Sequence, residues 1–218
     1  MQMFVPRADE ILKWVKGPKV LDVGCTSHTV ELNSPYWLHG RLRQKYASVT
    51  GIDISEENVA LLRKHGVTDL QVQSAESFEV PEKFDTIVAG ELIEHLANPG
   101  LFLQQAHRHL NKDGIVVLST PNAFSLAYFL YAFLKFPKTC ENSQHACWFC
   151  RQTMTELAER SGYKVLHFEL IDDYRPDVPS FLYRQFARLM ELASPVLPKR
   201  LRKTMLFVLT PNGHSVPS

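Results

Sequence analysis

The sequence predicts an α/β protein in which helices cover both faces of a mainly parallel sheet. Short apolar runs at residues 19–25, 49–54 and 84–90 read as buried strands, and segments with helical periodicity separate them. The first run contains a glycine near its end, which marks a turn at the carboxyl end of its strand. Since sheets of this kind bind ligands beyond the carboxyl ends of their strands, we expect the functional site at that edge.

Turn and capping signals define the other elements. Gly17-Pro18 ends a lead-in helix over residues 6–16, and Ser55 caps a helix that Gly66 ends. Further strands are expected at residues 70–72, 115–119, 163–171 and 205–210, and further helices from near Pro35 and at 99–110, 123–134, 152–160 and 181–192. One domain over residues 1–218 is then composed of a lead-in helix (1–17), a core (18–171), a helical insertion (172–203) and a last strand with a tail (204–218).

Composition and charge argue against several classes of protein. The 218 residues are 45% hydrophobic and carry a net charge of +1, so the chain can bury a core and has no overall field that recruits nucleic acid. No basic segment precedes an apolar one at the N-terminus, and no run reaches the roughly 18 apolar residues of a membrane span. We therefore expect a cytoplasmic protein whose four cysteines are reduced thiols.

Two strand ends carry the pattern of a nucleoside site. The run Leu21-Asp22-Val23-Gly24-Cys25 is followed by Val49-Thr50-Gly51-Ile52-Asp53-Ile54, whose acidic residue stands where βαβ nucleotide sites place a carboxylate for the ribose hydroxyls. Gly24 is followed by Cys25-Thr26-Ser27-His28, which has no second or third glycine, so a pyrophosphate would have no close approach to the backbone. The pattern favours a nucleoside cofactor without phosphate.

These motifs resemble those of the class I S-adenosylmethionine-dependent methyltransferases, whose first motif ends Asp-x-Gly-Cys-Gly. The match is Leu21-Asp22-Val23-Gly24-Cys25, with Thr26 in place of the last glycine, and the resemblance covers residues 20–171. It implies a Rossmann-like seven-stranded sheet in the order 3-2-1-4-5-7-6 with strand 7 antiparallel, and S-adenosylmethionine as the methyl donor. Residues 172–203 would be a helical insertion between strands 6 and 7.

The resemblance also implies cofactor contacts. Asp22 and Gly24 would hold the methionine end of S-adenosylmethionine, the glycine because its missing side chain lets the ligand lie against the backbone. Asp53 would accept from both ribose hydroxyls, and residues 73–76 would contact adenine, with Ser74 in place of the usual aspartate. The expected cofactor-binding residues are Asp22, Gly24, Cys25, Asp53, Ile54, Ser74, Ala75, Glu76 and Gly90.

Candidate catalytic residues follow the fourth expected strand. Glu91, Glu94 and His95 are spaced so that, on a helical turn, the first shares a face with either of the others. In one interpretation His95 or the later His145 is a general base that a carboxylate such as Glu91 orients. In the other, these three residues and His145 together bind a divalent cation that lowers the pKa of a substrate hydroxyl. Oxygen ligands suit Mg²⁺ or Mn²⁺, and the imidazoles also admit Zn²⁺ or Co²⁺.

The same segment resembles two groups of methyltransferases. Glu-x-x-Glu-His, followed by Ser119-Thr120-Pro121-Asn122 and a later histidine, resembles the small-RNA 3′-terminal 2′-O-methyltransferases, in which the four corresponding side chains hold Mg²⁺. Similar features occur in ubiquinone-type O-methyltransferases and in methyltransferases of sugars and glycans. The neutral charge and the lack of an appended RNA-binding module favour a small metabolite or a sugar as acceptor. A noncatalytic relative is the alternative, supported by the departures at Thr26 and Ser74.

A competing metal site is suggested by four residues that lie close together in the sequence. Cys140, His145, Cys147 and Cys150 could supply four zinc ligands. Structural zinc sites, however, normally take paired ligands from separated pieces of chain. We therefore expect Cys147 and Cys150 to pack in the core and His145 to face the cleft.

The acceptor pocket is the least patterned part of the chain. Its aromatic walls could be formed by Tyr36, Trp37, Tyr128 and Trp148, and the acceptor could hydrogen-bond to His28 or His39. For each of these residues, ordinary packing or surface exposure is the alternative. The apolar stretch 123–134 is expected to be a buried helix, with a membrane-surface or acyl-binding face as the alternative. For residues 172–203 and their basic cluster at 199–203, a lid, a dimer contact, a weak peripheral membrane anchor and a solvated basic turn all stay open.

Overall fold

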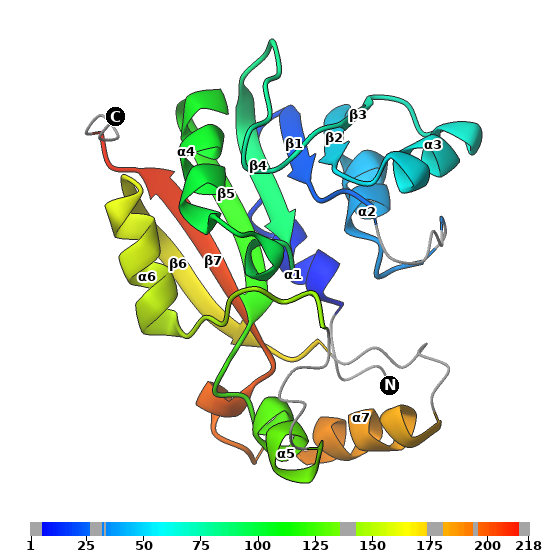
Figure 1. The fold of residues 1–218 in the computed structure, drawn as a ribbon, viewed down its shortest axis with the longest axis vertical. Coiled ribbons are helices and arrows are strands. Elements are labelled where there is room, and N and C mark those ends of the chain that lie inside the picture. The colour runs from blue at the N-terminus through cyan, green and yellow to red at the C-terminus, as the bar shows by residue number, and fades with distance from the viewer. Residues whose placement is uncertain are drawn as a thin grey trace.

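Seven strands form one sheet. They are β1 (Lys19–Val23), β2 (Ser48–Asp53), β3 (Leu70–Val72), β4 (Phe84–Gly90), β5 (Leu110–Pro121), β6 (Tyr163–Ile171) and β7 (Thr204–Pro211). The computed structural model describes residues 6–26, 32, 34–135, 143–173, 181–193 and 196–213. The strand order is β3-β2-β1-β4-β5-β7-β6, and β7 runs antiparallel to both of its neighbours while β1 to β5 run parallel (Figure 1). The expected order and the antiparallel seventh strand are confirmed.

Helices and short 3-10 turns connect the strands. They are α1 (Arg7–Leu12), α2 (Leu38–Lys45), α3 (Glu56–Lys64), η1 (Ile93–His95), α4 (Pro99–His109), α5 (Leu126–Lys135), α6 (Arg151–Arg160), α7 (Phe181–Ala193) and η2 (Lys199–Leu201). Because α7 and η2 follow β6 and precede β7, the helical insertion between the sixth and seventh strands is confirmed. Within the described residues, no helix is both long enough and apolar enough to cross a bilayer. The division into segments of a single domain stays a prediction.

Most elements lie within a few residues of their expected bounds, and two differences have a clear physical cause. β5 begins at Leu110 and not at residue 115, because Leu110 pairs with Phe84 before a register shift brings the strands into regular pairing. α5 begins at residue 126 and not at 123. The side chain of Asn122 accepts from the backbone N–H of Phe124, and Ser125 Oγ accepts from the N–H of Tyr128, so a turn and a cap precede the helix.

Alternating side chains along the strands divide the core between the two faces of the sheet. Leu21 lies in the cluster that contains Phe102 of α4 and Met154 of α6. Its neighbour Val20 points the other way and lies in the cluster that contains Ile11 of α1. Helices therefore cover both faces, as an α/β fold with a buried parallel sheet requires.

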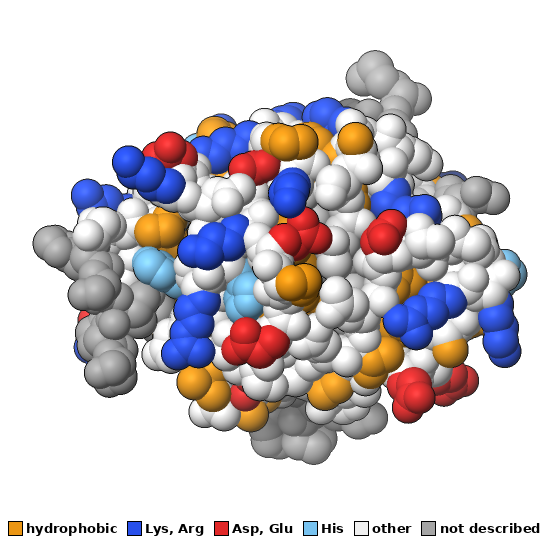
Figure 2. Space-filling view, turned by 90° about the horizontal axis from the view of Figure 1, so that it is seen from above, with side chains coloured by type: hydrophobic (Ala, Val, Ile, Leu, Met, Phe, Trp, Pro, Cys, Tyr) orange, Lys and Arg blue, Asp and Glu red, His pale blue; other side chains and the backbone are white. Residues whose placement is uncertain are grey.

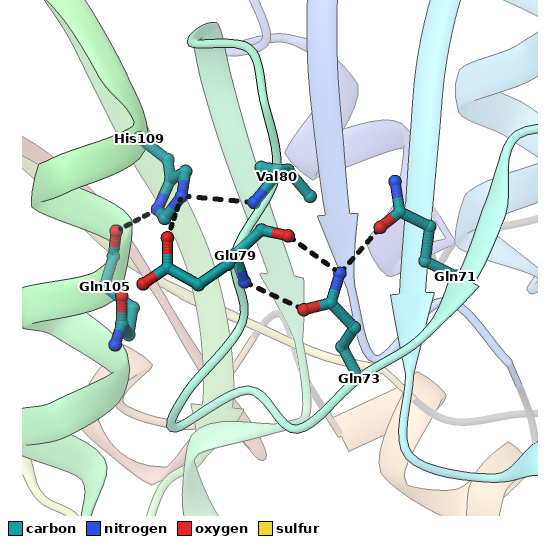
Figure 3. A network of polar contacts seen from close by, with 6 residues as sticks. All are labelled: Gln71, Gln73, Glu79, Val80, Gln105 and His109. Carbon is teal, nitrogen blue, oxygen red and sulfur yellow. Dashed lines mark hydrogen bonds and ion pairs between the residues drawn. The ribbon is translucent and has the colours of Figure 1, made fainter.

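A polar network fixes the loop between β3 and β4 (Figure 3). The side-chain amide of Gln73 bonds to both backbone groups of Glu79, donating to its carbonyl at 3.0 Å and accepting from its N–H at 2.8 Å. Nε2 of His109 accepts from the N–H of Val80 at 3.4 Å, while Nδ1 donates to the carbonyl of Gln105 at 2.8 Å. The loop that carries residues 74–76 is thereby tied to α4.

Candidate functional site

The turn that follows β1 brings two predicted sites together. Gly24 has a φ of +77°, and its N–H and that of Cys25 both donate to the carbonyl of Ile52, at 2.8 and 3.1 Å. A Cβ atom on Gly24 would lie 3.0 Å from Cδ1 of Leu92, which belongs to the segment after β4. The proposed cofactor loop and the segment with the candidate catalytic residues are therefore in contact.

Asp53, at the end of β2, is held by the loop after Gly24. Its Oδ2 accepts from the N–H of Thr26 at 3.0 Å and from the Thr26 hydroxyl at 2.8 Å, and its Oδ1 accepts from the N–H of Ser55 at 2.9 Å. Since each carboxylate oxygen has two lone pairs, Oδ2 is fully used and Oδ1 keeps one lone pair for a further donor. Thr26, which replaces a glycine of the family motif, orients the carboxylate proposed to bind ribose.

Asp22 and His39 form a buried pair. The exposed fraction of Asp22 is 1% and that of His39 is 0%, and Nδ1 of the histidine lies 3.1 Å from Oδ2 of the aspartate. Burial raises the pKa of Asp22, and the hydrogen bond with His39 opposes part of that rise. The expectation that His39 hydrogen-bonds an acceptor is wrong, because α2 packs this ring inside the fold. That Asp22 takes part in cofactor binding stays a prediction. Its hydrogen bond with His39 favours a role in positioning the turn after β1 over direct contact with the cofactor.

The other residues around the two strand ends differ in exposure. Cys25 is buried, which raises the pKa of its thiol, and its carbonyl accepts from Nε1 of Trp37 at 3.0 Å. Trp37 is itself 8% exposed, which favours the alternative of ordinary packing over a place in the wall of an acceptor pocket. Ile54, directly after Asp53, is 76% exposed and offers an apolar surface beside the ribose-binding candidate. Gly90 is half-buried at the end of β4.

The side chain of Glu76 is engaged at the start of α4. Its Oε1 accepts from the backbone N–H groups of Ala97 and Asn98, at 2.9 and 3.1 Å, and its Oε2 accepts from the Asn98 side chain at 3.2 Å. Ser74 Oγ accepts from the N–H of Glu76 at 3.2 Å, and Ala75 is buried. Asn98 is the residue at the N-terminal cap of α4, but its side chain makes no capping hydrogen bond. Glu76 instead accepts from the backbone N–H of Asn98 and so satisfies one of the free donors at the start of the helix. The adenine contact of residues 74–76 stays a prediction.

Glu94, in η1 just past β4, is the most deeply buried candidate catalytic residue. It is 1% exposed, and its Oε2 accepts from the Thr120 hydroxyl at 3.0 Å. Among the described residues no hydrogen-bond partner reaches its Oε1. Burial raises the pKa of Glu94 to about 7, although the Thr120 hydrogen bond and the nearby Arg7 lower it in part. A buried carboxylate with one open oxygen is a feature of sites that bind a proton or a cation.

Two histidines complete a cluster with this carboxylate. One ligand atom from each of Glu94, His95 and His145 lies within 4.8 Å of the others. The backbone carbonyl of Glu94 accepts from the N–H groups of Ala146 and Cys147, at 2.8 and 3.0 Å, which holds the later segment against η1. The two imidazoles meet edge to face, with ring centroids 4.8 Å apart. Residues that are distant in sequence are thus brought to one point, in the segment whose Leu92 lies next to Gly24.

Aromatic side chains extend from this cluster toward α5. The ring of Trp148 lies edge-on to His145, with centroids 5.8 Å apart, and edge-on to Tyr128, with centroids 4.8 Å apart. Trp148 is 37% exposed and Tyr128 is buried. These two expected wall residues lie beside the cluster, whereas half-buried Tyr36 lies in the turn before α2.

Glu91 is not one of the three residues whose ligand atoms come together in this cluster. Its backbone has a φ of +54°, which interrupts any helix through residues 91–95, so the expectation of a shared helical face is wrong. Its carboxylate lies 3.3 Å from Nη1 of Arg7, and Nε of Arg7 lies 3.6 Å from Asp173. The sequence offered no signal for Arg7. Thr120 belongs to the Ser119-Thr120-Pro121-Asn122 segment of the family resemblance. Its hydroxyl at the end of a strand was the one feature of the sequence that could have indicated its contact with Glu94.

The donors of the cluster fit a divalent cation with mixed ligands. One carboxylate with an open buried oxygen and two imidazoles suit Zn²⁺, Mn²⁺ or Co²⁺ better than Mg²⁺, which prefers oxygen ligands. The competing zinc set is not assembled within the described residues. Cys147 Sγ bonds to the carbonyl of Leu96 at 3.7 Å, and Cys150 lies at the start of α6. Cys140 and His28 lie outside the described residues.

Known proteins resemble this chain in sequence and in fold. A family model described as "Methyltransferase domain" matches residues 5–168. The ubiquinone biosynthesis O-methyltransferase of Pseudomonas aeruginosa (strain LESB58) is 36% identical over 119 residues, which cover 51% of this chain and 48% of that protein. The chain thus spans about half the length of the curated relatives that it matches first.

Solved structures with low sequence identity share the fold. An S-adenosylmethionine-dependent methyltransferase from Archaeoglobus fulgidus superposes with a TM-score of 0.64 at 16% identity, covering 93% of this chain and 90% of that one. Magnesium protoporphyrin IX methyltransferase from Synechocystis PCC 6803, with bound S-adenosylhomocysteine, gives a TM-score of 0.59 at 15% identity, covering 93% and 80%. With the family match over residues 5–168, the chain belongs to the class I S-adenosylmethionine-dependent methyltransferases.

Proposed function

We propose that this protein transfers a methyl group from S-adenosylmethionine to a hydroxyl of a small metabolite or of a sugar. The observation that carries the proposal is the cluster of Glu94, His95 and His145, which begins two residues after Leu92, the residue next to Gly24 in the turn after β1. It joins groups that can take a proton to a loop that suits a nucleoside cofactor. The names of the sequence relatives, ubiquinone biosynthesis O-methyltransferases, support oxygen as the acceptor atom.

The cofactor would lie across the ends of β1 and β2. S-adenosylmethionine would supply a methyl group on a sulfonium, from which S-adenosylhomocysteine leaves as the carbon–sulfur bond breaks and the acceptor oxygen bonds to the methyl carbon. Asp53 is oriented by Thr26 and keeps one lone pair, on Oδ1, for a ribose hydroxyl, and the exposed Ile54 offers an apolar surface next to it. Gly24 leaves the backbone open to the ligand because it has no side chain.

Proton removal would be the task of the histidines. An acceptor hydroxyl becomes a better nucleophile when a base with a pKa near neutrality takes its proton as the oxygen attacks. His145 and His95 are half-buried and meet at their rings, and Glu94 lies within reach of both. In this proposal one of the two histidines is the base. Glu94, and not Glu91 as expected from the sequence, is the carboxylate that orients it.

A divalent cation is the second way in which this cluster could act. Glu94, His95 and His145 would hold it, and its charge would lower the pKa of an acceptor hydroxyl. The same three residues would serve as base or as metal ligands. A chelator distinguishes the two mechanisms, because it would abolish only the one that needs a metal. The aromatic rings of Trp148 and Tyr128 beside the cluster suit a flat or sugar-like acceptor. A cytoplasmic location stays a prediction.

The test is a methyl-transfer screen with labelled S-adenosylmethionine against catechols, sugars and RNA 3′ ends, with each of Mg²⁺, Mn²⁺ and Zn²⁺ and with chelator. We expect turnover of a catechol or sugar, and a loss of about 100-fold or more in the variants His145→Ala and Glu94→Gln. His65→Ala and Glu159→Gln are the matched controls, since both residues are exposed, His65 directly after α3 and Glu159 on α6.

The outcomes separate the alternatives. Turnover that needs Mn²⁺ or Zn²⁺ assigns the cluster to a metal, and turnover that persists in chelator assigns it to the histidine base. Methylation of RNA 3′ ends alone contradicts the small-molecule acceptor. Cofactor binding without turnover on any acceptor favours the noncatalytic relative, and equal losses in the two control variants would remove the cluster from the mechanism.

A further inference from the structure

The helices beyond the sheet expose large apolar side chains. Seven of the thirteen large hydrophobic residues with high exposure in the described part of the chain fall within residues 124–133 and 181–196. On α5, Phe129 and Phe133 are 65% and 77% exposed and stack on each other with ring centroids 6.4 Å apart. On α7, Leu192 is 71% exposed. Both helices lie beyond the lower end of the sheet in Figure 1, toward which the arrow of β4 points.

α7 has one anchored side and one open side. Met190 is buried and lines a small pocket with Leu197 and Leu201, which attaches the helix to the segment before β7. Phe181, Arg188 and Leu192 are exposed and recur at spacings that place them on one stripe opposite Met190. Where a helix lies on a membrane, exposed apolar side chains can enter the headgroup boundary, and a long basic side chain among them can extend to the lipid phosphates.

The charge of the chain is concentrated in the same region. Residues 181–203 contain six Lys and Arg and one Glu, a net charge of +5, while the whole chain has +1, so the remaining residues together carry −4. Arg184, Arg188, Lys199 and Arg200 are all exposed. The opposite end of the molecule is different: Figure 2 shows charges of both signs interspersed there, with hydrophobic side chains in small separate areas.

We propose that the open faces of α5 and α7, with η2, attach the protein to a membrane surface that contains anionic lipid. The basic side chains complement lipid phosphates, and the Phe and Leu side chains enter the boundary between headgroups and acyl chains. RNA would match the charge but not the exposed apolar residues. A second copy of the chain would bring two positively charged faces together. The attachment needs neither cofactor nor turnover, so it stands apart from the proposed methyl transfer.

Sedimentation of the full chain with vesicles tests the proposal. One set of vesicles is phosphatidylcholine and the other is phosphatidylcholine with phosphatidylglycerol, and binding should be stronger to the second. Arg184→Gln with Arg188→Gln should lower the partition onto the anionic vesicles about thirtyfold, since each basic residue near such a surface contributes about 1 kcal/mol. Phe129→Ser with Leu192→Ser should lower it at least tenfold on both sets.

Matched double variants control for general effects of charge and apolar surface. Arg43→Gln with Arg108→Gln removes two exposed cations elsewhere, and Leu61→Ser with Leu101→Ser removes two exposed apolar side chains on α3 and α4. Both controls should bind vesicles as the parent does, and circular dichroism should show every variant folded. Absence of binding to either set of vesicles overturns the proposal, as do equal losses in the controls. The proposal is also overturned if the parent does not bind vesicles and light scattering shows instead that it is a dimer, which Phe129→Ser with Leu192→Ser dissociates.

Discussion

Oδ2 of Asp53 accepts two hydrogen bonds from Thr26, one from the hydroxyl at 2.8 Å and one from the backbone N–H at 3.0 Å. The family motif has a glycine where this chain has Thr26, so the substitution brings a donor to the carboxylate proposed to bind ribose. A carboxylate that is already oriented loses less freedom when a ligand arrives. Thr26 is therefore a positioning residue for the cofactor site and not a defect in it.

Removing the hydroxyl should weaken cofactor binding. For Thr26→Val we expect the affinity for S-adenosylhomocysteine to fall about fivefold, or by about 1 kcal/mol, because the Asp53 carboxylate would then have to be ordered when the ligand binds. Thr26→Ser keeps the hydroxyl and should bind as the parent does. Calorimetric titration measures both, and tighter binding by the valine variant would mean that the hydroxyl competes with the ligand.

Gly24→Ala should destabilise the fold. The residue has a φ of +77°, and a Cβ atom would lie 3.0 Å from Leu92, so the added methyl group meets both backbone strain and a close contact. We expect the free energy of unfolding to fall by about 1–3 kcal/mol in denaturant titration. Gly100→Ala, in the first turn of α4 with its nearest neighbour atom at 3.9 Å, is the control and should be neutral or slightly stabilising. Equal effects at both positions would contradict this account of the turn.

Glu94 should make stability depend on pH in metal-free protein. Its pKa is raised from 4.5 to about 7, so the folded state binds the proton more tightly than the unfolded chain. The resulting stabilisation is complete below about pH 4.5 and is lost as the pH rises through about 7, a change on the order of 3 kcal/mol. Glu94→Gln removes this titration and keeps an acceptor for Thr120.

The measurement for this prediction is unfolding by denaturant, with chelator present, at several pH values between those two limits. The stability of Glu94→Gln relative to the parent should rise steadily across the range. The exposed carboxylate variant Glu159→Gln should keep a constant difference from the parent. A constant difference for Glu94→Gln as well would show that Glu94 does not hold its proton near neutrality.

The sheet was predictable because its strands are marked locally. Residues 70–72, 84–90 and 163–171 carry apolar runs bounded by turn signals, and each forms a strand with those bounds. The start of β5 was not predictable, because Asn111 to Gly114 reads as a turn and only pairing of Leu110 with Phe84 makes the segment part of a strand. Contacts across the sheet decide such boundaries.

The site was predictable in composition but not in arrangement. Sequence spacing placed Glu91 with Glu94 and His95, yet a backbone with positive φ turns Glu91 to Arg7, which no pattern in the sequence marks. His39 looked available for an acceptor, although its place between Leu38 and Leu42 on a short helix hinted at the buried side. Side-chain direction depends on packing between distant segments, and spacing within one segment cannot supply it.

Calorimetric titration of S-adenosylhomocysteine into the parent chain and into Asp53→Ala tests the central claim most directly. The parent should bind at one site, and Asp53→Ala should lose more than about tenfold in affinity, because a hydrogen bond from a ribose hydroxyl to a charged acceptor disappears. Asp113→Ala, at an exposed position in β5, should bind as the parent does. No binding by the parent, or equal affinity in Asp53→Ala, would contradict the proposed cofactor site.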